Sequence, residues 1–198
     1  MLEWDEFLLC CREIEAVSAT LGDGWSFVVA KEGEPGFTYL EKKCSLLRKP
    51  SPGARWSDED WLQETDPGCA EGHAEEVLQC VYHIVYSVSY GVPVMYFNVW
   101  RQDGSLLPLS EVWSLMPDCL QEQLRELRWT TVTQQEHPIH GVPYFQLHPC
   151  KTSDLMEQTR CRRTKHRNYL VTWLSTIAPV VGLVVPVEYS AIVTPPPS

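Results

Sequence analysis

The sequence predicts an α+β domain in which an antiparallel sheet is flanked by helices. Several apolar segments with the character of strands follow one another, separated by turn residues or by one longer loop. Consecutive strands of this kind pair through hairpins and give an antiparallel sheet. Segments with helical spacing stand before and after them. The helices are therefore expected to cover the faces of the sheet, and a parallel βαβ fold is excluded.

The first predicted elements are a helix and a hairpin. Apolar residues such as Phe7 fall near helical spacing over residues 2–20, and Gly22 ends that helix. Residues 25–31 and 37–48 then have the composition of two strands. The sequence Gly-Glu-Pro-Gly between them is a turn signal, so the two strands are predicted to form a hairpin.

The middle of the chain contains a loop and two further strands. Residues 49–76 are rich in Pro, Gly and acidic residues, which predicts a long mobile loop. Residues 77–90 are apolar on both faces, which is typical of a central strand covered on both sides. Gly91 and Pro93 turn the chain into the next strand, at 94–100.

Short helices and extended segments are expected in the second half. Ser110 is predicted to cap a helix that ends before Pro117, and Asp118 to cap a second helix that runs to Leu127. The remaining elements are extended segments at 130–133 and 144–147 and a helix at 168–177. The elements together predict one domain over residues 1–190, with a mobile loop at 49–76, a basic loop at 157–167 and a flexible tail at 191–198.

Composition limits the classes of partner. The chain has 198 residues, of which 44% are hydrophobic, and a net charge of -10. An acidic surface repels nucleic acid and anionic lipid, so a protein partner with a basic face is expected, and a monomer is the default. The uncharged stretch 170–187 is long enough to span a membrane, but Pro179, Gly182 and Pro186 interrupt it. It predicts a short buried helix followed by an extended strand, without membrane insertion.

The eight cysteines are expected to be reduced thiols of a cytoplasmic protein. Asp5 and Glu6 stand where a secretory signal would need basic residues, so a disulfide framework is not expected. The spacings also contain no pair of CxxC motifs, which argues against a structural zinc ribbon.

Cys150 has the setting of a nucleophile. It follows a predicted strand and Pro149, which stiffens the approach and holds the thiol at the edge of a loop. Lys151 favours the thiolate, which is the form that attacks. The alternative for Cys150, judged from these residues alone, is an inert loop thiol.

The histidines leave two further alternatives open. His137, His140, His148 and Cys150 are close in sequence and could supply ligands to a metal ion. A Cys–His hydrolase could use Cys150 as nucleophile and His137 or His140 as base. His83, in the middle of a predicted strand, is expected to be a core or sheet-face histidine.

Several separate blocks of sequence resemble one known family. The blocks are residues 86–90, 93–97, 133–138, 147–152 and 168–183. Together they resemble the family of autophagy-related protein ten, an E2-like conjugating enzyme of autophagy. The resemblance is close over residues 77–190 and looser before them. It implies a variant of the ubiquitin-conjugating fold.

The resemblance also implies a reaction. The ubiquitin-like modifier, autophagy-related protein twelve, would be received from an E1-like activating enzyme, autophagy-related protein seven. Cys150 would hold the modifier as a thioester and pass it to a lysine of autophagy-related protein five, without a cofactor. His148 is the nearest polar candidate to support the oxyanion, and Tyr90 could orient the incoming lysine. A sheet edge, at 25–48 or 94–100, could receive the acceptor by strand pairing. The alternative is a non-catalytic protein-binding module of the same fold.

Overall fold

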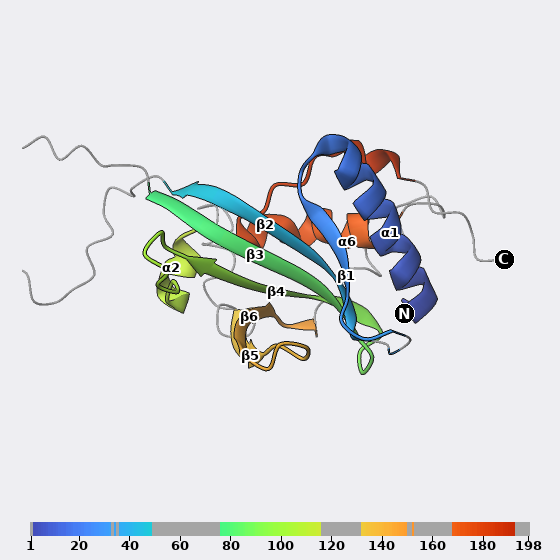
Figure 1. Ribbon diagram of the computed structural model, residues 1–198, viewed down its shortest axis with the longest axis horizontal. Coiled ribbons are helices and arrows are strands. Elements are labelled where there is room, and N and C mark those ends of the chain that lie inside the picture. Colours follow the sequence, from blue (N-terminus) through green and yellow to red (C-terminus); the bar gives the residue numbers. More distant parts are fainter. Residues whose placement is uncertain are drawn as a thin grey trace, which may run out of the picture.

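Six strands form one antiparallel sheet in the order β1-β2-β3-β4-β6-β5 (Figure 1). The computed structural model describes residues 2–32, 34, 36–48, 76–115, 132–149, 152 and 168–192. Helices precede and follow the strands in sequence, so the predicted α+β class with an antiparallel sheet is confirmed.

The described strands have the following bounds: β1 Trp25–Val29, β2 Thr38–Arg48, β3 Glu76–Ser87, β4 Val92–Trp100, β5 Val132–Glu136 and β6 Pro143–Leu147. The described α-helices are α1 Trp4–Leu21, α2 Leu109–Ser114 and α6 Tyr169–Ile177, and the 3₁₀ helices are η2 Ala178–Val181 and η3 Val187–Ala191.

Helices α1 and α6 pack against each other and against one face of the sheet (Figure 1). Phe7, Cys11 and Ile14 form the buried stripe of α1. The helix ends at Gly22, whose φ of 67° lies in the left-handed region and whose N–H donates to the carbonyl of Ser18. The predicted first helix and its glycine stop are confirmed.

Strand β3 is buried on both faces, as predicted. Its alternate residues toward the helices join the main core: Leu78, Cys80, Tyr82, Ile84 and Tyr86. On the opposite face, Val85 packs in a smaller cluster with Tyr39, Val94, Tyr96 and Tyr144. Among the described residues, the second face is therefore covered by aromatic side chains and by the segment between β5 and β6.

The sheet is unevenly paired. Strands β2 and β3 pair over ten residue positions, and β5 and β6 pair over five. Between β4 and β6 only Tyr96↔Gln146 and Phe97↔Phe145 pair. Strand β4 thus lies inside the sheet, and the expectation that 94–100 is a free sheet edge is wrong. Strand β1 does lie at an edge of the described sheet.

Three local predictions differ from the structure. The strand expected to run to Tyr90 ends at Ser87, and Tyr90 lies in the turn before β4. Pro108, not Ser110, is the N-cap of α2. The chain after α6 continues as η2, not as an extended strand, because Pro179 has a φ angle that suits the first turn of a helix.

Some expectations lie outside the described residues: most of the loop at 49–76, the helix at 118–127, Cys150, the basic loop at 157–167 and residues 193–198. Of the expected tail, Ala191 ends η3, and Ile192 packs partly buried against the main core. Within the described ranges, no helix is long and apolar enough to cross a membrane.

Candidate active site

Strand β6 holds the segment that leads to Cys150. Tyr144, Phe145 and Leu147 are buried, and the amide of Gln146 donates to the hydroxyl of Tyr96 at 3.1 Å. Pro149, directly after the strand and His148, is buried as well. The residues that precede Cys150 are therefore fixed against the body of the domain, although Cys150 itself lies outside the described residues.

Tyr90 and His148 lie together at this end of the sheet. Their ring centroids are 6.5 Å apart and their planes are inclined by 71°, an edge-on arrangement. Half of the Tyr90 side-chain surface is exposed. The structure thus brings together two residues for which the resemblance implies different roles.

The turn that carries Tyr90 is tied down on both sides. Gly91, with a φ of 58°, donates its N–H to the carbonyl of Ser87, and the N–H of Leu2 donates to the Gly91 carbonyl at 3.0 Å. The hydroxyl of Tyr86 donates to the Leu2 carbonyl at 2.9 Å. These bonds connect the amino-terminal residues to the turn and fix the backbone next to Tyr90.

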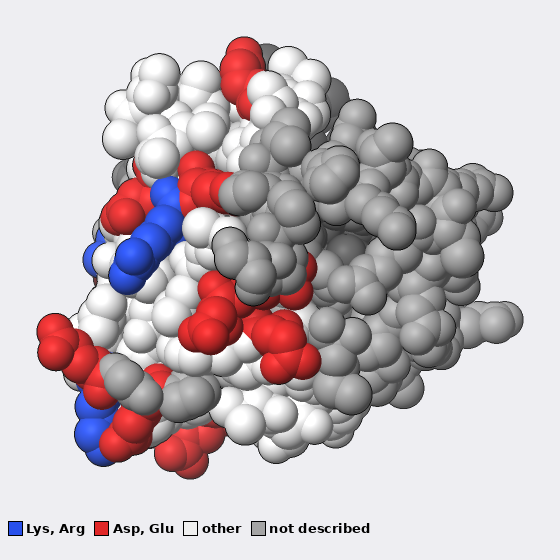
Figure 2. Space-filling model, turned by 90° about the vertical axis from the view of Figure 1, so that its right-hand side faces the viewer, with Lys and Arg blue, Asp and Glu red and all other residues white. Residues whose placement is uncertain are grey.

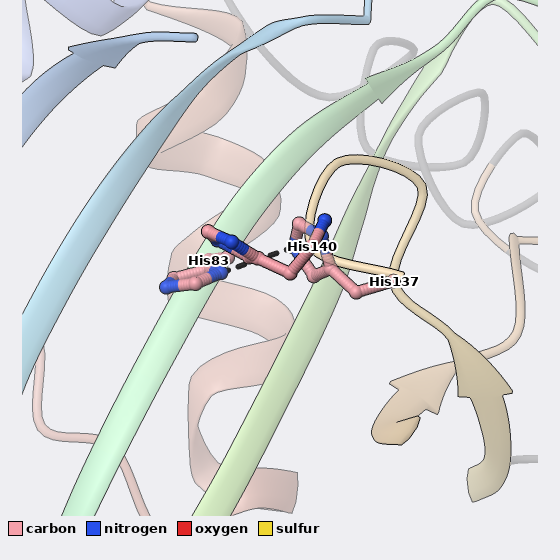
Figure 3. A group of neighbouring side chains, drawn as sticks. All are labelled: His83, His137 and His140. Atoms are coloured by element: carbon pink, nitrogen blue, oxygen red, sulfur yellow. Dashed lines mark hydrogen bonds between the residues drawn. The ribbon is translucent and has the colours of Figure 1, made fainter. Parts of the chain in front are cut away.

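The other described histidines form a separate cluster on the second face of the sheet (Figure 3). His83 projects from β3, and His137 and His140 come from the segment between β5 and β6. His83 is 1% exposed, so the expectation of a sheet-face histidine is confirmed. The predicted grouping of His137 with His140 is confirmed, but the cluster includes His83 in place of His148 within the described chain.

A directed chain of hydrogen bonds runs through two of these rings. The backbone N–H groups of Ile139 and His140 donate to His137 Nδ1, at 3.2 and 3.3 Å. The proton of neutral His137 is therefore on Nε2, which donates to His83 Nδ1 at 3.0 Å. His83 Nε2 in turn donates to Glu41 Oε2 at 3.1 Å.

Burial keeps these two rings neutral. It lowers the pKa of His83 to about 4, against the opposing effect of Glu41, and it lowers the pKa of His137 to about 3. Both nitrogens of His137 are occupied and its side chain is fully buried. His137 is therefore unsuited to the role of general base. Of the two bases that the Cys–His hydrolase alternative offered, this excludes His137.

Glu41 and Tyr39 complete this cluster and were missed from the sequence. The hydroxyl of Tyr39 lies 3.1 Å from His140 Nε2, and Glu41 pairs directly with His83 across β2 and β3. A signal was present, because His83 is a polar residue in an otherwise apolar strand. Which residue of β2 faces His83 depends on the exact register of the β2–β3 pair. The long loop between these strands prevents that register from being predicted.

Comparison with known proteins identifies the family. Residues 6–188 match the family described as "Autophagocytosis associated protein, active-site domain". The chain is also 44% identical over 209 residues to the human protein named "Ubiquitin-like-conjugating enzyme ATG10", covering 96% of this chain and 95% of the human one. The chain belongs to the ATG10 family.

More distant ATG10 proteins match part of the chain. The relative from Arabidopsis thaliana is 42% identical over 113 residues, which is 54% of this chain and 50% of the plant protein. The relative from Dictyostelium discoideum is 34% identical over 119 residues, again 54% of this chain and 52% of its own length. All carry the name ubiquitin-like-conjugating enzyme, so this member of the family is an E2-like transferase of autophagy with the E2-like variant of the α+β fold.

Proposed function

We propose that Cys150 carries a ubiquitin-like modifier as a thioester and delivers it to a lysine of an acceptor protein. The observation that carries this proposal is the position of Cys150 two residues after His148, whose ring lies against Tyr90. Membership of the ATG10 family supports the class of reaction. The proposed modifier is autophagy-related protein twelve, the activating enzyme autophagy-related protein seven, and the acceptor autophagy-related protein five.

The proposed reaction has two acyl transfers. The Cys150 thiolate attacks the carbonyl carbon of the modifier's terminal glycine and displaces the thiolate of the activating enzyme. The uncharged amine of the acceptor lysine then attacks the same carbon, and the Cys150 thiolate leaves as an isopeptide bond forms. The lysine loses one proton in this step. The thioester already supplies the activation, so neither transfer needs a cofactor.

His148 and Tyr90 are proposed to assist the second transfer. The tetrahedral intermediate carries a negative oxygen, and an N–H donor held nearby stabilises it more than it stabilises the planar thioester. His148, fixed by β6 and by the edge contact with Tyr90, is the proposed donor. The half-exposed Tyr90 hydroxyl is proposed to orient the incoming lysine amine.

Surface charge supports protein partners with basic faces. Among the residues that Figure 2 colours, Asp and Glu side chains gather in several groups, and Lys and Arg side chains lie beside some of them on the left. Helix α1 contributes Asp5 and Glu6 in its first turn and has no basic residue in its last turn. Such a surface speeds association with basic partner surfaces and repels phosphate backbones. An edge strand such as β1 is a further proposed docking element, through strand pairing with the acceptor.

The proposal also covers organisation and location. We propose one domain over residues 1–190, acting as a monomer in the cytoplasm. The described cysteines, Cys10, Cys11, Cys44 and Cys80, are free, which suits a reducing compartment.

A charging assay tests the proposal. Purified chain is mixed with activating enzyme, modifier and ATP and run on reducing and non-reducing gels. We expect a band heavier by one modifier that disappears with reductant. Cys150→Ala should abolish this band, and Cys150→Ser should give a band that resists reductant, because an oxyester replaces the thioester. Cys161→Ser, a cysteine in the basic run, is the matched control and should charge like the wild type.

The opposite outcome would support a different function. If no band forms although the activating enzyme charges its own cysteine, the thioester proposal is wrong. A non-catalytic protein-binding module of the same fold would then be the better description, and Cys150→Ala would leave binding to the acceptor intact.

A further inference from the structure

Three imidazole rings converge on the second face of the sheet. Each of His83, His137 and His140 offers one ring nitrogen, and these three atoms lie within 4.8 Å of one another (Figure 3). We propose that these three histidines bind one divalent transition-metal ion, with zinc as the expected ion. Neutral imidazoles are the ligands that zinc, copper and nickel prefer, whereas magnesium and calcium prefer oxygen.

One pair of these nitrogens has nearly the spacing of a tetrahedral site. Metal–nitrogen bonds of about 2.0–2.1 Å in a tetrahedron separate the ligand atoms by roughly 3.3 Å. His83 Nδ1 and His137 Nε2 are 3.0 Å apart, joined by a hydrogen bond. An ion can therefore replace the shared proton if these two rings separate by a few tenths of an ångström and His140, whose nitrogen lies within 4.8 Å of theirs, moves to bonding distance.

The hydrogen-bond partners of His83 and His140 that lie outside the cluster favour metal binding. Glu41 Oε2 accepts from His83 Nε2, which keeps the proton on that nitrogen and leaves the Nδ1 lone pair directed at the cluster. A carboxylate in this position orients a metal-binding histidine and makes it more basic. When His140 Nε2 donates to the hydroxyl of Tyr39, 3.1 Å away, His140 Nδ1 also keeps its lone pair.

Binding requires one rearrangement, at His137. Its Nε2 proton must leave, and a neutral ring then carries its proton on Nδ1. The two hydrogen bonds that Nδ1 accepts from Ile139 and His140, at 3.2 and 3.3 Å, are then lost. The ring changes tautomer without a net release of a proton, so metal binding is coupled to movement of the turn at 138–141.

Solvent reaches the cluster at His140, in that turn. His140 is exposed, whereas His83 and His137 are 1% and 0% exposed. The described part of the chain supplies three ligands to the group, which leaves a fourth position for water. The ion would connect β3 to the β5–β6 segment, which the sheet itself joins to β4 at only two residue pairs.

The first test is metal titration of the full chain, reduced and freed of metal. We titrate with Co²⁺, following visible absorption, and with Zn²⁺, following heat. One ion per chain is expected, with tetrahedral coordination by three nitrogens and one water. His140→Ala should weaken the affinity at least tenfold, because it removes one ligand from an exposed position. His148→Ala, a histidine outside the cluster, is the matched control and should bind like the wild type.

A second measurement needs no variant. Nitrogen-15 chemical shifts of the imidazoles report the tautomer of each ring, and Zn²⁺ should move the His137 proton from Nε2 to Nδ1. The proposal is overturned if no ion binds, if His140→Ala binds as tightly as the wild type, or if a thiolate-to-cobalt charge-transfer band shows that cysteines hold the ion. An unchanged His137 tautomer in zinc-saturated protein also overturns it.

Discussion

The ring of His148 meets the ring of Tyr90 edge-on, with 6.5 Å between their centroids. The two residues are far apart in sequence, and different contacts hold each of them in place. Strand β6 fixes the backbone before His148, and the bond from Leu2 to Gly91 fixes the turn that carries Tyr90. Because the two rings are in contact, a change at one residue alters the surroundings of the other, and their contributions to the reaction should not be additive.

Substitutions at this pair should separate charging from transfer. His148→Ala is expected to slow discharge of the thioester to lysine by about 10²-fold, the effect of losing one oxyanion donor. Tyr90→Phe should slow discharge by roughly tenfold, because it removes only a positioning hydroxyl. Single-turnover discharge of preformed thioester measures both rates, and the rate of charging by the activating enzyme is the internal control. Equal losses in charging and discharge would argue against these roles.

Asp23 ties three elements together and should be important for stability. Its carboxylate accepts from Ser18 at the end of α1, from Lys42 of β2 at 3.0 Å and from the hydroxyl of Tyr189 of η3 at 2.8 Å. Lys42 is only 6% exposed, so Asp23→Ala leaves a buried ammonium without its partner. We expect a loss of about 3 kcal/mol in the free energy of unfolding, measured in urea. Asp5→Ala, at an exposed position of α1, should change it by less than about 0.5 kcal/mol.

The same carboxylate predicts a pH dependence. Burial alone would raise the pKa of Asp23, but the hydrogen bonds from Ser18, Lys42 and Tyr189 outweigh burial and lower it below its ordinary value of 3.8. A lowered pKa contributes stability that is complete above the ordinary value and is lost as the pH falls through the folded-state value. Asp23→Asn should therefore flatten the stability profile below about pH 4. Urea midpoints at several acidic pH values measure this, and an unchanged slope would contradict it.

Tyr82 makes a buried hydrogen bond between the sheet and the carboxyl-terminal segment. Its hydroxyl donates to the carbonyl of Val181 at 2.9 Å, and its side chain is fully buried. Tyr82→Phe leaves that carbonyl without its donor, so we expect a loss of about 1–2 kcal/mol in unfolding free energy. Tyr90→Phe, at a half-exposed tyrosine, is the matched control for stability and should have little effect. Equal midpoints for the two variants would show that the Tyr82 bond adds nothing.

Asn168 caps α6 and also binds α1. Its Oδ1 accepts from the N–H of Val171 at 3.0 Å, and its Nδ2 donates to the Cys10 carbonyl and to Glu13 Oε2. Asn168→Asp keeps the cap, which asparagine and aspartate provide equally well, but it loses both donations and places two carboxylates together. Asn168→Ala loses the cap as well. Thermal unfolding should give wild type as the most stable, and both variants should lose at least about 1 kcal/mol.

The fold could be predicted where the local pattern determines the element. Phe7, Cys11 and Ile14 recur at helical spacing before Gly22, and β3 alternates apolar residues on both faces. The end of β3 could not be predicted, since Val88 and Tyr90 continue its alternation although residues 88–91 form the turn to β4. The 3₁₀ helix after α6 was missed because an apolar run with proline does not distinguish it from a strand.

The candidate site could be predicted only in part. The resemblance named Tyr90 and His148, and their contact follows from pairing that no local pattern reveals. The histidine cluster depends on the placement of the β5–β6 segment against β3, a long-range contact between residues 54 positions apart. Sequence reasoning grouped His137 with His148 because they are near in the chain. In the structure His137 instead bonds to His83, which in turn bonds to Glu41.

The sparse pairing between β4 and β6 has a consequence for local opening. The β5–β6 hairpin is connected internally by five residue pairs, but only two pairs link it to the rest of the sheet. It therefore has the form of a cooperative unit that can detach at lower free energy than the β2–β3–β4 layer, and its amide hydrogens at Gln146 and Leu147 should exchange with solvent earlier. Since this unit precedes Cys150 in the chain, a partner that docks on the hairpin would slow its exchange and rigidify the approach to the thiol at the same time.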